Sequence, residues 1–145
     1  MKEATEIESA AKMKDVNDAA RSCILNLNNF TPTVLIRQSW TLLSGQWDVL
    51  PPEVIGDGLS QQGFSGTWAT ESDGLCEGTE GSVTYVMDDA ATTMTMYWGN
   101  FYFQTSNYFI LVEGPMGAKY TAGYNVSGDD NATVFYVLAP STDMS

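Results

Sequence analysis

The chain has no histidine and very few basic residues. Its 145 residues include 6 Lys and Arg against 18 Asp and Glu, which gives a net charge of −12. Without histidine, the most common general base and zinc ligand are missing, and so is every catalytic triad that uses imidazole. After Ser22, the only basic residues are Arg37 and Lys119. Such an acidic chain repels nucleic-acid phosphates and anionic lipids, so we expect no nucleic-acid partner and only neutral or zwitterionic membranes as targets.

Cysteines and long apolar segments are also scarce. Cys23 and Cys76 form no Cys-x-x-Cys motif and lack the spacing of metal ligands, so we expect no metal and no cofactor. The simplest interpretation is two separate buried thiols; a disulfide between them remains an open alternative. No run of about 20 apolar residues exists to span a bilayer, and "MKEATEIESAAKMK" lacks the apolar region of a signal peptide. We expect a soluble protein without a signal peptide.

Two parts of unequal length are predicted along the chain. Residues 1–21 are rich in Ala, Glu and Lys and predict a short helical appendage, with apolar residues at roughly helical spacing: Ile7, Ala11, Val16 and Ala20. Residues 22–145 predict an all-β domain, because about eight short strands alternate with Gly, Pro, Asn and Asp turns. The strands are expected at 23–28, 34–47 (one long strand or a bent pair), 63–71, 82–87, 93–98, 107–113, 119–126 and 132–139. This arrangement is typical of an antiparallel β-sandwich, and no regular structure is expected at 50–58, where two prolines and two glycines occur.

The segment "YWGNFYFQTSNYF", residues 97–109, has aromatic side chains at seven of its thirteen positions. In the strand before it, Met94, Met96 and Trp98 share one face, which we expect to be the core face. Three consecutive aromatic residues follow: Phe101, Tyr102 and Phe103. They cannot all point inward, so we place them on a loop at the tip of a hairpin. Either this loop folds back to cap the sandwich, or it presents a binding patch to solvent; we carry the second interpretation forward.

Acidic residues gather in "ESDGLCEGTEGSVTY", residues 71–85, where no base is near in sequence. The four carboxylates are Glu71, Asp73, Glu77 and Glu80. Their spacing matches no EF-hand, and a pair of acids in a turn is most often a solvated loop. Three functional interpretations stay open: a weak calcium loop, a glycosidase-type pair formed by Glu77 and Glu80, and a carboxylate that faces the cationic part of a lipid headgroup beside aromatic walls.

Three segments in this order resemble motifs of the aegerolysins, small acidic β-sandwich proteins of fungi and bacteria. They are "QSWTLL" (38–43), "SDGLCEGTEGSVTY" (72–85) and "YWGNFYFQTSN" (97–107), and the resemblance covers roughly residues 22–138. It implies an actinoporin-like fold and a non-enzymatic protein that binds zwitterionic, sphingolipid-containing membranes. It further implies a larger perforin-type partner, assembly on membranes, insecticidal activity in some bacterial pairs, and a protein made in the cytoplasm that acts at target-cell membranes.

The resemblance also assigns site residues. Trp40 matches a headgroup-contacting tryptophan, and Glu77 matches the carboxylate that adjusts headgroup selectivity. Tyr102 lies where the family has a membrane-facing tryptophan. Trp98, Phe101 and Phe103 are added because the aromatic segment is expected to form or support an apolar docking surface, so the predicted lipid-binding set is Trp40, Glu77, Trp98, Phe101, Tyr102 and Phe103. Gly99 and Phe101 replace an aspartate and a proline of the family motif, and these departures bear on lipid specificity more than on the fold.

Two other functions compete with lipid binding. A lectin of the β-sandwich type would stack a sugar on Trp98 and hydrogen-bond its hydroxyls through Asn100 and Asn107. A hydrolase would use carboxylates such as Glu71 and Glu77, although no feature of the sequence pairs them across a cleft. A glycan array compared with a lipid overlay separates the lectin from the lipid-binding protein.

Overall fold

The computed structural model describes residues 20–59, 64–74 and 76–141. The predicted helix within residues 1–21 lies outside the described residues except for its last two positions. Along the described residues, the chain forms ten strands and one turn of 3-10 helix. In order they are β1 (Ser22–Asn29), β2 (Leu35–Ser44), β3 (Gln46–Val49), β4 (Val54–Ile55), β5 (Ser65–Glu71), β6 (Thr79–Val86), β7 (Thr93–Asn100), β8 (Asn107–Glu113), η1 (Gly117–Lys119), β9 (Tyr120–Ser127) and β10 (Asn131–Pro140).

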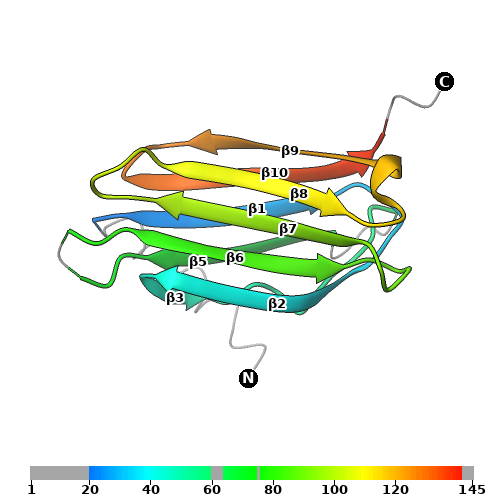
Figure 1. The fold of residues 1–145 in the computed structure, drawn as a ribbon, viewed down its shortest axis with the longest axis horizontal. Coiled ribbons are helices and arrows are strands. Elements are labelled where there is room, and N and C mark those ends of the chain that lie inside the picture. The colour runs from blue at the N-terminus through cyan, green and yellow to red at the C-terminus, as the bar shows by residue number, and fades with distance from the viewer. Residues whose placement is uncertain (1–19, 60–63, 75, 142–145) are drawn as a thin grey trace.

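The strands form two stacked five-stranded sheets, as the all-β sandwich prediction requires. The front sheet in Figure 1 has the order β4-β2-β6-β7-β8, and the rear sheet has the order β3-β5-β1-β10-β9. Among the strand pairs described, all are antiparallel except β1 and β10, which run parallel. No helix in the described part of the chain is long and apolar enough to cross a bilayer.

Alternation of side chains produces the core between the sheets. Met94, Met96 and Trp98 of β7 are fully buried, whereas Thr93 and Thr95 on the opposite face are partly exposed. The same period of two recurs in β1, β6 and β10. Each strand therefore gives one apolar face to the core, as its sequence predicts.

The centre of the core is a cluster of aromatic rings. Trp98 meets Trp47 and Trp68 edge-on, with ring centroids 5.8 and 6.1 Å apart, and Trp68 stacks on Tyr136. The indole nitrogen of Trp98 donates a hydrogen bond of 3.1 Å to Oγ1 of Thr70. Rings from both sheets thus interlock, which ties the two layers together.

The predicted segment 34–47 is a bent pair rather than one strand. Gly45 (φ 93°) separates β2 in the front sheet from β3 in the rear sheet. A Cβ at this glycine would lie 2.5 Å from the carbonyl oxygen of Glu71, so a side chain here is excluded by space as well as by φ. The prediction for 50–58 needs a small correction: after the two prolines, Val54 and Ile55 form the short strand β4, which pairs with the start of β2.

The two cysteines are free and lie in different environments, so a disulfide between them is not present. Cys23 is buried, but Cys76 is exposed, which corrects the expectation of two buried thiols. Cys76 sits in a turn and has a positive φ of 60°. Burial raises the pKa of the Cys23 thiol to about 12.

This difference gives a prediction for thiol chemistry. Iodoacetamide at pH 8 is expected to alkylate Cys76 in the folded protein and to leave Cys23 unmodified, because only the thiolate reacts. Intact-mass and peptide-mass analysis should show one modification in buffer and two in denaturant. Alkylation of Cys23 without denaturant would contradict the burial described above.

Candidate functional site at one end of the sandwich

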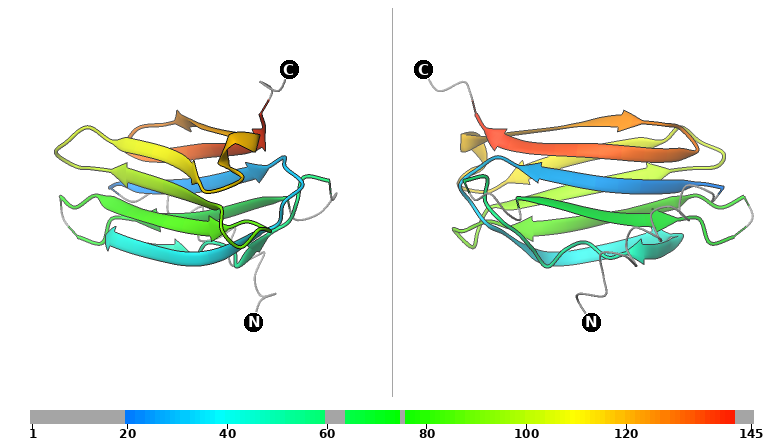
Figure 2. Two further views of the ribbon diagram at one scale, coloured as in Figure 1. Left: turned by 45° about the vertical axis from the view of Figure 1, so that its right-hand side comes forward. Right: turned by 180° about the vertical axis from the view of Figure 1, so that it is seen from behind.

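Three connecting segments meet at the end of the sandwich drawn at the left of Figure 1. They join β5 to β6, β7 to β8, and β9 to β10. The β7–β8 connection, residues 101–106, contains the three consecutive aromatic residues and is called the aromatic loop below. Both views in Figure 2 also show these three segments at the same end of the sandwich.

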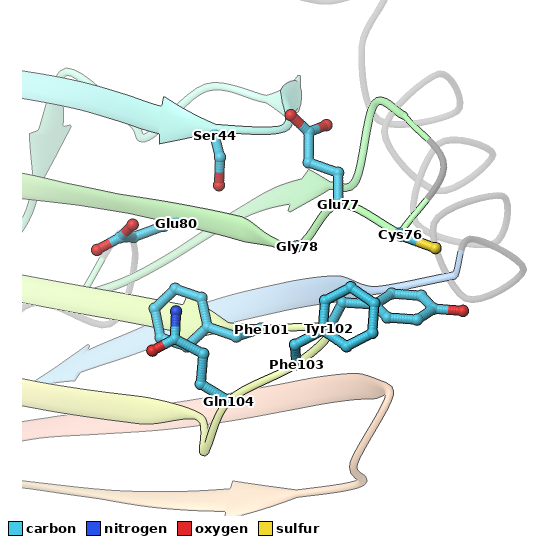
Figure 3. Close-up of a pocket in the computed structure, with 9 residues that line it drawn as sticks. All are labelled: Ser44, Cys76, Glu77, Gly78, Glu80, Phe101, Tyr102, Phe103 and Gln104. Atoms are coloured by element: carbon cyan, nitrogen blue, oxygen red, sulfur yellow. The ribbon is translucent and has the colours of Figure 1, made fainter.

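A hollow of about 330 Å³ opens between the aromatic loop and the β5–β6 connection (Figure 3). It is lined by Ser44, Cys76, Glu77, Gly78, Glu80, Phe101, Tyr102, Phe103 and Gln104. The fold therefore brings four of the six predicted lipid-binding residues to one place, because Glu77 and the aromatic loop line the same hollow. They are about 25 residues apart in sequence, and the antiparallel pairing of β6 with β7 brings them together.

The three rings of the aromatic loop differ in environment. Phe103 is 82% exposed and meets the ring of Tyr102 edge-on at a centroid distance of 5.1 Å. Phe101 folds back over the sheet: a Cβ at Gly99 would lie 2.6 Å from the Phe101 ring. Each of the two alternatives for this loop thus describes part of it, since one ring covers the sheet and another projects into solvent.

The base of the aromatic loop is firmly held. The side-chain nitrogen of Asn100 donates to the carbonyl oxygens of Ser22, Asp129 and Asp130 at 2.9 to 3.0 Å, and its Oδ1 accepts from Ser106. A Cβ at Gly78 would lie 2.5 Å from the carbonyl oxygen of Asn100, so the neighbouring connection also packs closely against the loop. The rings are therefore carried on a fixed base.

Arg21 adds a second attachment. Its Nε donates to the carbonyl oxygen of Phe101 at 3.3 Å, and its guanidinium lies 4.3 Å from the centroid of the Tyr102 ring. It also forms an ion pair of 3.5 Å with Asp130. This role could not be predicted from the sequence, because a single arginine before a strand carries no signal of a partner 80 residues away.

The carboxylates of this end are engaged in local hydrogen bonds. Oε1 of Glu77 accepts from the backbone N–H of Asp73 at 2.9 Å, and in Figure 3 its carboxylate points away from the rings. Glu80 accepts from the Tyr97 hydroxyl at 2.6 Å; burial and this carboxylate raise the pKa of Tyr97. Glu71 accepts from Gln46 and does not line the hollow, so the fold does not bring it beside Glu77 there, whereas Glu77 and Glu80 both line the hollow.

Among the described residues, no group of three Cys, Asp or Glu side chains could hold a metal ion.

The two remaining predicted site residues lie elsewhere. Trp40 is 42% exposed and covered by the Arg37 guanidinium at 3.8 Å from its ring centroid. It pairs with Val83, which pairs with Met96 in the middle of the front sheet. Since Met96 is five residues from Phe101, Trp40 is about 17 Å from the aromatic loop along the strand direction.

The prediction that Trp98 belongs to the lipid-binding site is wrong. It is fully buried in the core, so it cannot touch a lipid or a sugar unless the sandwich opens. Asn100 is also buried and holds the backbone of its neighbours, whereas Asn107 is exposed. The lectin site built from Trp98, Asn100 and Asn107 is therefore wrong: stacking requires an accessible ring, and the physical role of Trp98 is packing.

The observed architecture defines a β-sandwich that carries an aromatic loop and a small hollow at one end. A crystal structure described as that of the lipid binding protein Nakanori is similar to it, with a TM-score of 0.73 over 95% of this chain and 82% of that chain. The two sequences are 12% identical, so the likeness establishes the fold alone. No protein-family model matches the chain, and no curated protein matches it in sequence.

Proposed function

We propose that this protein recognises membrane lipid through the aromatic loop, without an enzymatic activity. The observation that carries the proposal is Phe103, a large apolar ring that is 82% exposed beside Tyr102 on a firmly held loop. Rings presented on loops at the end of a sandwich are a usual arrangement for recognition. The likeness of the fold to a lipid binding protein supports the same conclusion.

The free energy expected from burying the aromatic rings is consistent with reversible docking to a membrane. An aromatic ring that buries about 100 Å² in a bilayer interface gains about 2.5 kcal/mol at 25 cal/mol per Å². Two or three rings then give about 5 to 7.5 kcal/mol before ordering costs, so the affinity is micromolar at best and weaker once those costs are subtracted. The net charge of −12 opposes anionic surfaces, so the target is a neutral or zwitterionic membrane.

The finer part of the proposal follows the resemblance to the aegerolysins. The lipid is a zwitterionic sphingolipid such as sphingomyelin or ceramide phosphoethanolamine, with its amine against the ring faces of the hollow. In this proposal the Glu77 carboxylate, which points away from the rings in Figure 3, turns toward the amine when the lipid binds. The chain then serves as the membrane-recognising component of a two-component cytolysin, and a larger perforin-type protein forms the pore. The resemblance to bacterial pairs makes insects a candidate target.

Co-sedimentation with vesicles of defined composition tests the proposed function. The protein is expected to pellet with vesicles of phosphatidylcholine and cholesterol that contain sphingomyelin or ceramide phosphoethanolamine. Phosphatidylcholine vesicles with and without phosphatidylserine serve as controls, and added phosphatidylserine should weaken binding. Failure to pellet with every zwitterionic vesicle would refute lipid recognition, while equal binding with and without sphingolipid would refute only the lipid specificity.

A further inference from the structure

A second concave surface lies on the outer face of the rear sheet, away from the hollow at the sandwich end. It is a groove of about 500 Å³ over β9 and β10, which are seen from behind in the right view of Figure 2. Its lining consists of Thr121, Ala122, Gly123, Tyr124, Asn125, Phe135, Val137 and Ala139. It shares no residue with the aromatic loop or its hollow. Its volume falls within the range of roughly 300–1,000 Å³ that is typical of small-molecule sites.

The register of three strands places an aromatic ring between two amides. Phe135 of β10 pairs with Asn26 of β1 on one side and with Asn125 of β9 on the other. The Phe135 ring is 45% exposed, and both of its chain neighbours point into the core, so the ring faces outward. The Asn26 amide nitrogen donates to Oγ1 of Thr67 and to the Gly66 carbonyl oxygen. These bonds fix its orientation and leave the side-chain carbonyl oxygen as an acceptor.

In the next row of the sheet, Val137 and Gly123 line the groove. Asn28, Val137 and Gly123 are in register there, about 7 Å from the first row. A Cβ at Gly123 would have no atom within 4 Å, which means that the glycine leaves open space above the sheet. The absence of a side chain at Gly123 thus leaves this row of the groove open to a ligand.

The chemistry of this surface is neutral in a strongly acidic protein. None of the residues that line the groove is charged, although the whole chain carries a net charge of −12. A charged ligand would find no partner in the groove. A flat apolar ring flanked by amides, with the hydroxyl of Thr121 two rows further along the groove, matches a ligand that has an apolar face and a rim of hydroxyl groups.

We infer that this groove binds a neutral oligosaccharide. One sugar ring stacks its C–H face on Phe135, and the Asn26 and Asn125 amides hydrogen-bond its hydroxyl groups. The adjoining residue of the glycan occupies the space above Gly123. Because the groove and the aromatic loop share no residue, glycan binding is independent of lipid docking.

Gly123→Ile gives the sharpest test of this site. The new side chain meets open space and suits an extended strand, so the fold is expected to be kept while the groove is filled. The wild-type protein is first applied to an array of neutral and acidic glycans, and the best neutral binder is then titrated into ¹⁵N-labelled protein. Amide shifts are expected along the two rows around Phe135 and Gly123. Gly123→Ile should abolish these shifts, and Phe135→Ala should weaken binding about tenfold, the loss expected for one stacked ring.

Two controls separate this site from the proposed lipid site and from general damage. Phe30→Ala removes an exposed ring of similar accessibility elsewhere and should leave glycan affinity unchanged. Gly123→Ile should still bind vesicles as the wild type does, so loss of glycan binding alone leaves the lipid proposal intact. An array on which only acidic glycans or none bind overturns the inference, and so does undiminished binding by Gly123→Ile.

Discussion

Replacing Trp98 with alanine is expected to lower the free energy of unfolding by about 4 kcal/mol, the range for a large buried ring. Trp98 is fully buried and contacts the rings of Trp47 and Trp68 from the opposite sheet. Its indole also donates the hydrogen bond to Thr70, which would lose this donor. Urea denaturation followed by circular dichroism measures the change, with the midpoint falling and the slope kept.

Trp40→Ala is the matched control for this prediction. Its ring is 42% exposed and its described ring contact is with Arg37, so the expected cost is about 1 kcal/mol or less. Trp98→Phe, which keeps most of the apolar volume, should retain vesicle binding. A Trp98→Ala protein with wild-type stability but no vesicle binding would contradict the core position of Trp98. It would mean that Trp98 belongs to the docking surface.

Much of the fold could be predicted from local patterns in the sequence. β1, β6, β7, β9 and β10 lie where apolar residues between turn residues predicted strands. β8 also lies where a strand was predicted, but it was expected to be strongly buried, whereas Phe109 and Leu111 are exposed. For residues 34–47 the sequence allowed either one long strand or a bent pair. The bend at Gly45 depends on its close approach to the backbone of Glu71, which is 26 residues away in sequence. Neither the assignment of each strand to a sheet nor the parallel pairing of β1 with β10 could be predicted. Both depend on contacts between residues far apart in sequence, about 110 positions in the case of β1 and β10.

The candidate site shows the same division between local and distant information. The exposed ring of Phe103 follows from three consecutive aromatic residues that cannot all face inward. Asn100 and Arg21 were missed as the supports of this loop, because their partners are 78 and 80 residues away in sequence. Trp98 shows the opposite error: its core-facing position was predicted from alternation, yet it was also counted among the residues that form or support the docking surface.

Replacing Tyr102 and Phe103 together with alanine is expected to reduce vesicle affinity about 100-fold, or about 3 kcal/mol. Phe103 contributes most, because its ring is 82% exposed and free to enter the lipid interface. Tyr102 contributes less, because the Arg21 guanidinium already covers part of its ring. Phe101 is kept in this variant, since its ring covers Gly99 and its loss would disturb the end of β7. Co-sedimentation with sphingolipid vesicles measures the affinity, and circular dichroism verifies that the fold is unchanged.

Phe30→Ala is the control for the loss of an exposed phenylalanine. Phe30 is 49% exposed and follows the end of β1, whereas the amide of Asn100 holds the beginning of that strand, so Phe30 and the aromatic loop lie at opposite ends of the sandwich. This variant should bind vesicles like the wild type, because a ring at the far end cannot reach a membrane that the aromatic loop contacts. Arg21→Gln should give an intermediate loss, since the rings remain but one of their attachments is removed. Unchanged vesicle binding by the Tyr102 and Phe103 double variant would mean that the loop only caps the sandwich. The lipid surface would then have to lie elsewhere on the protein.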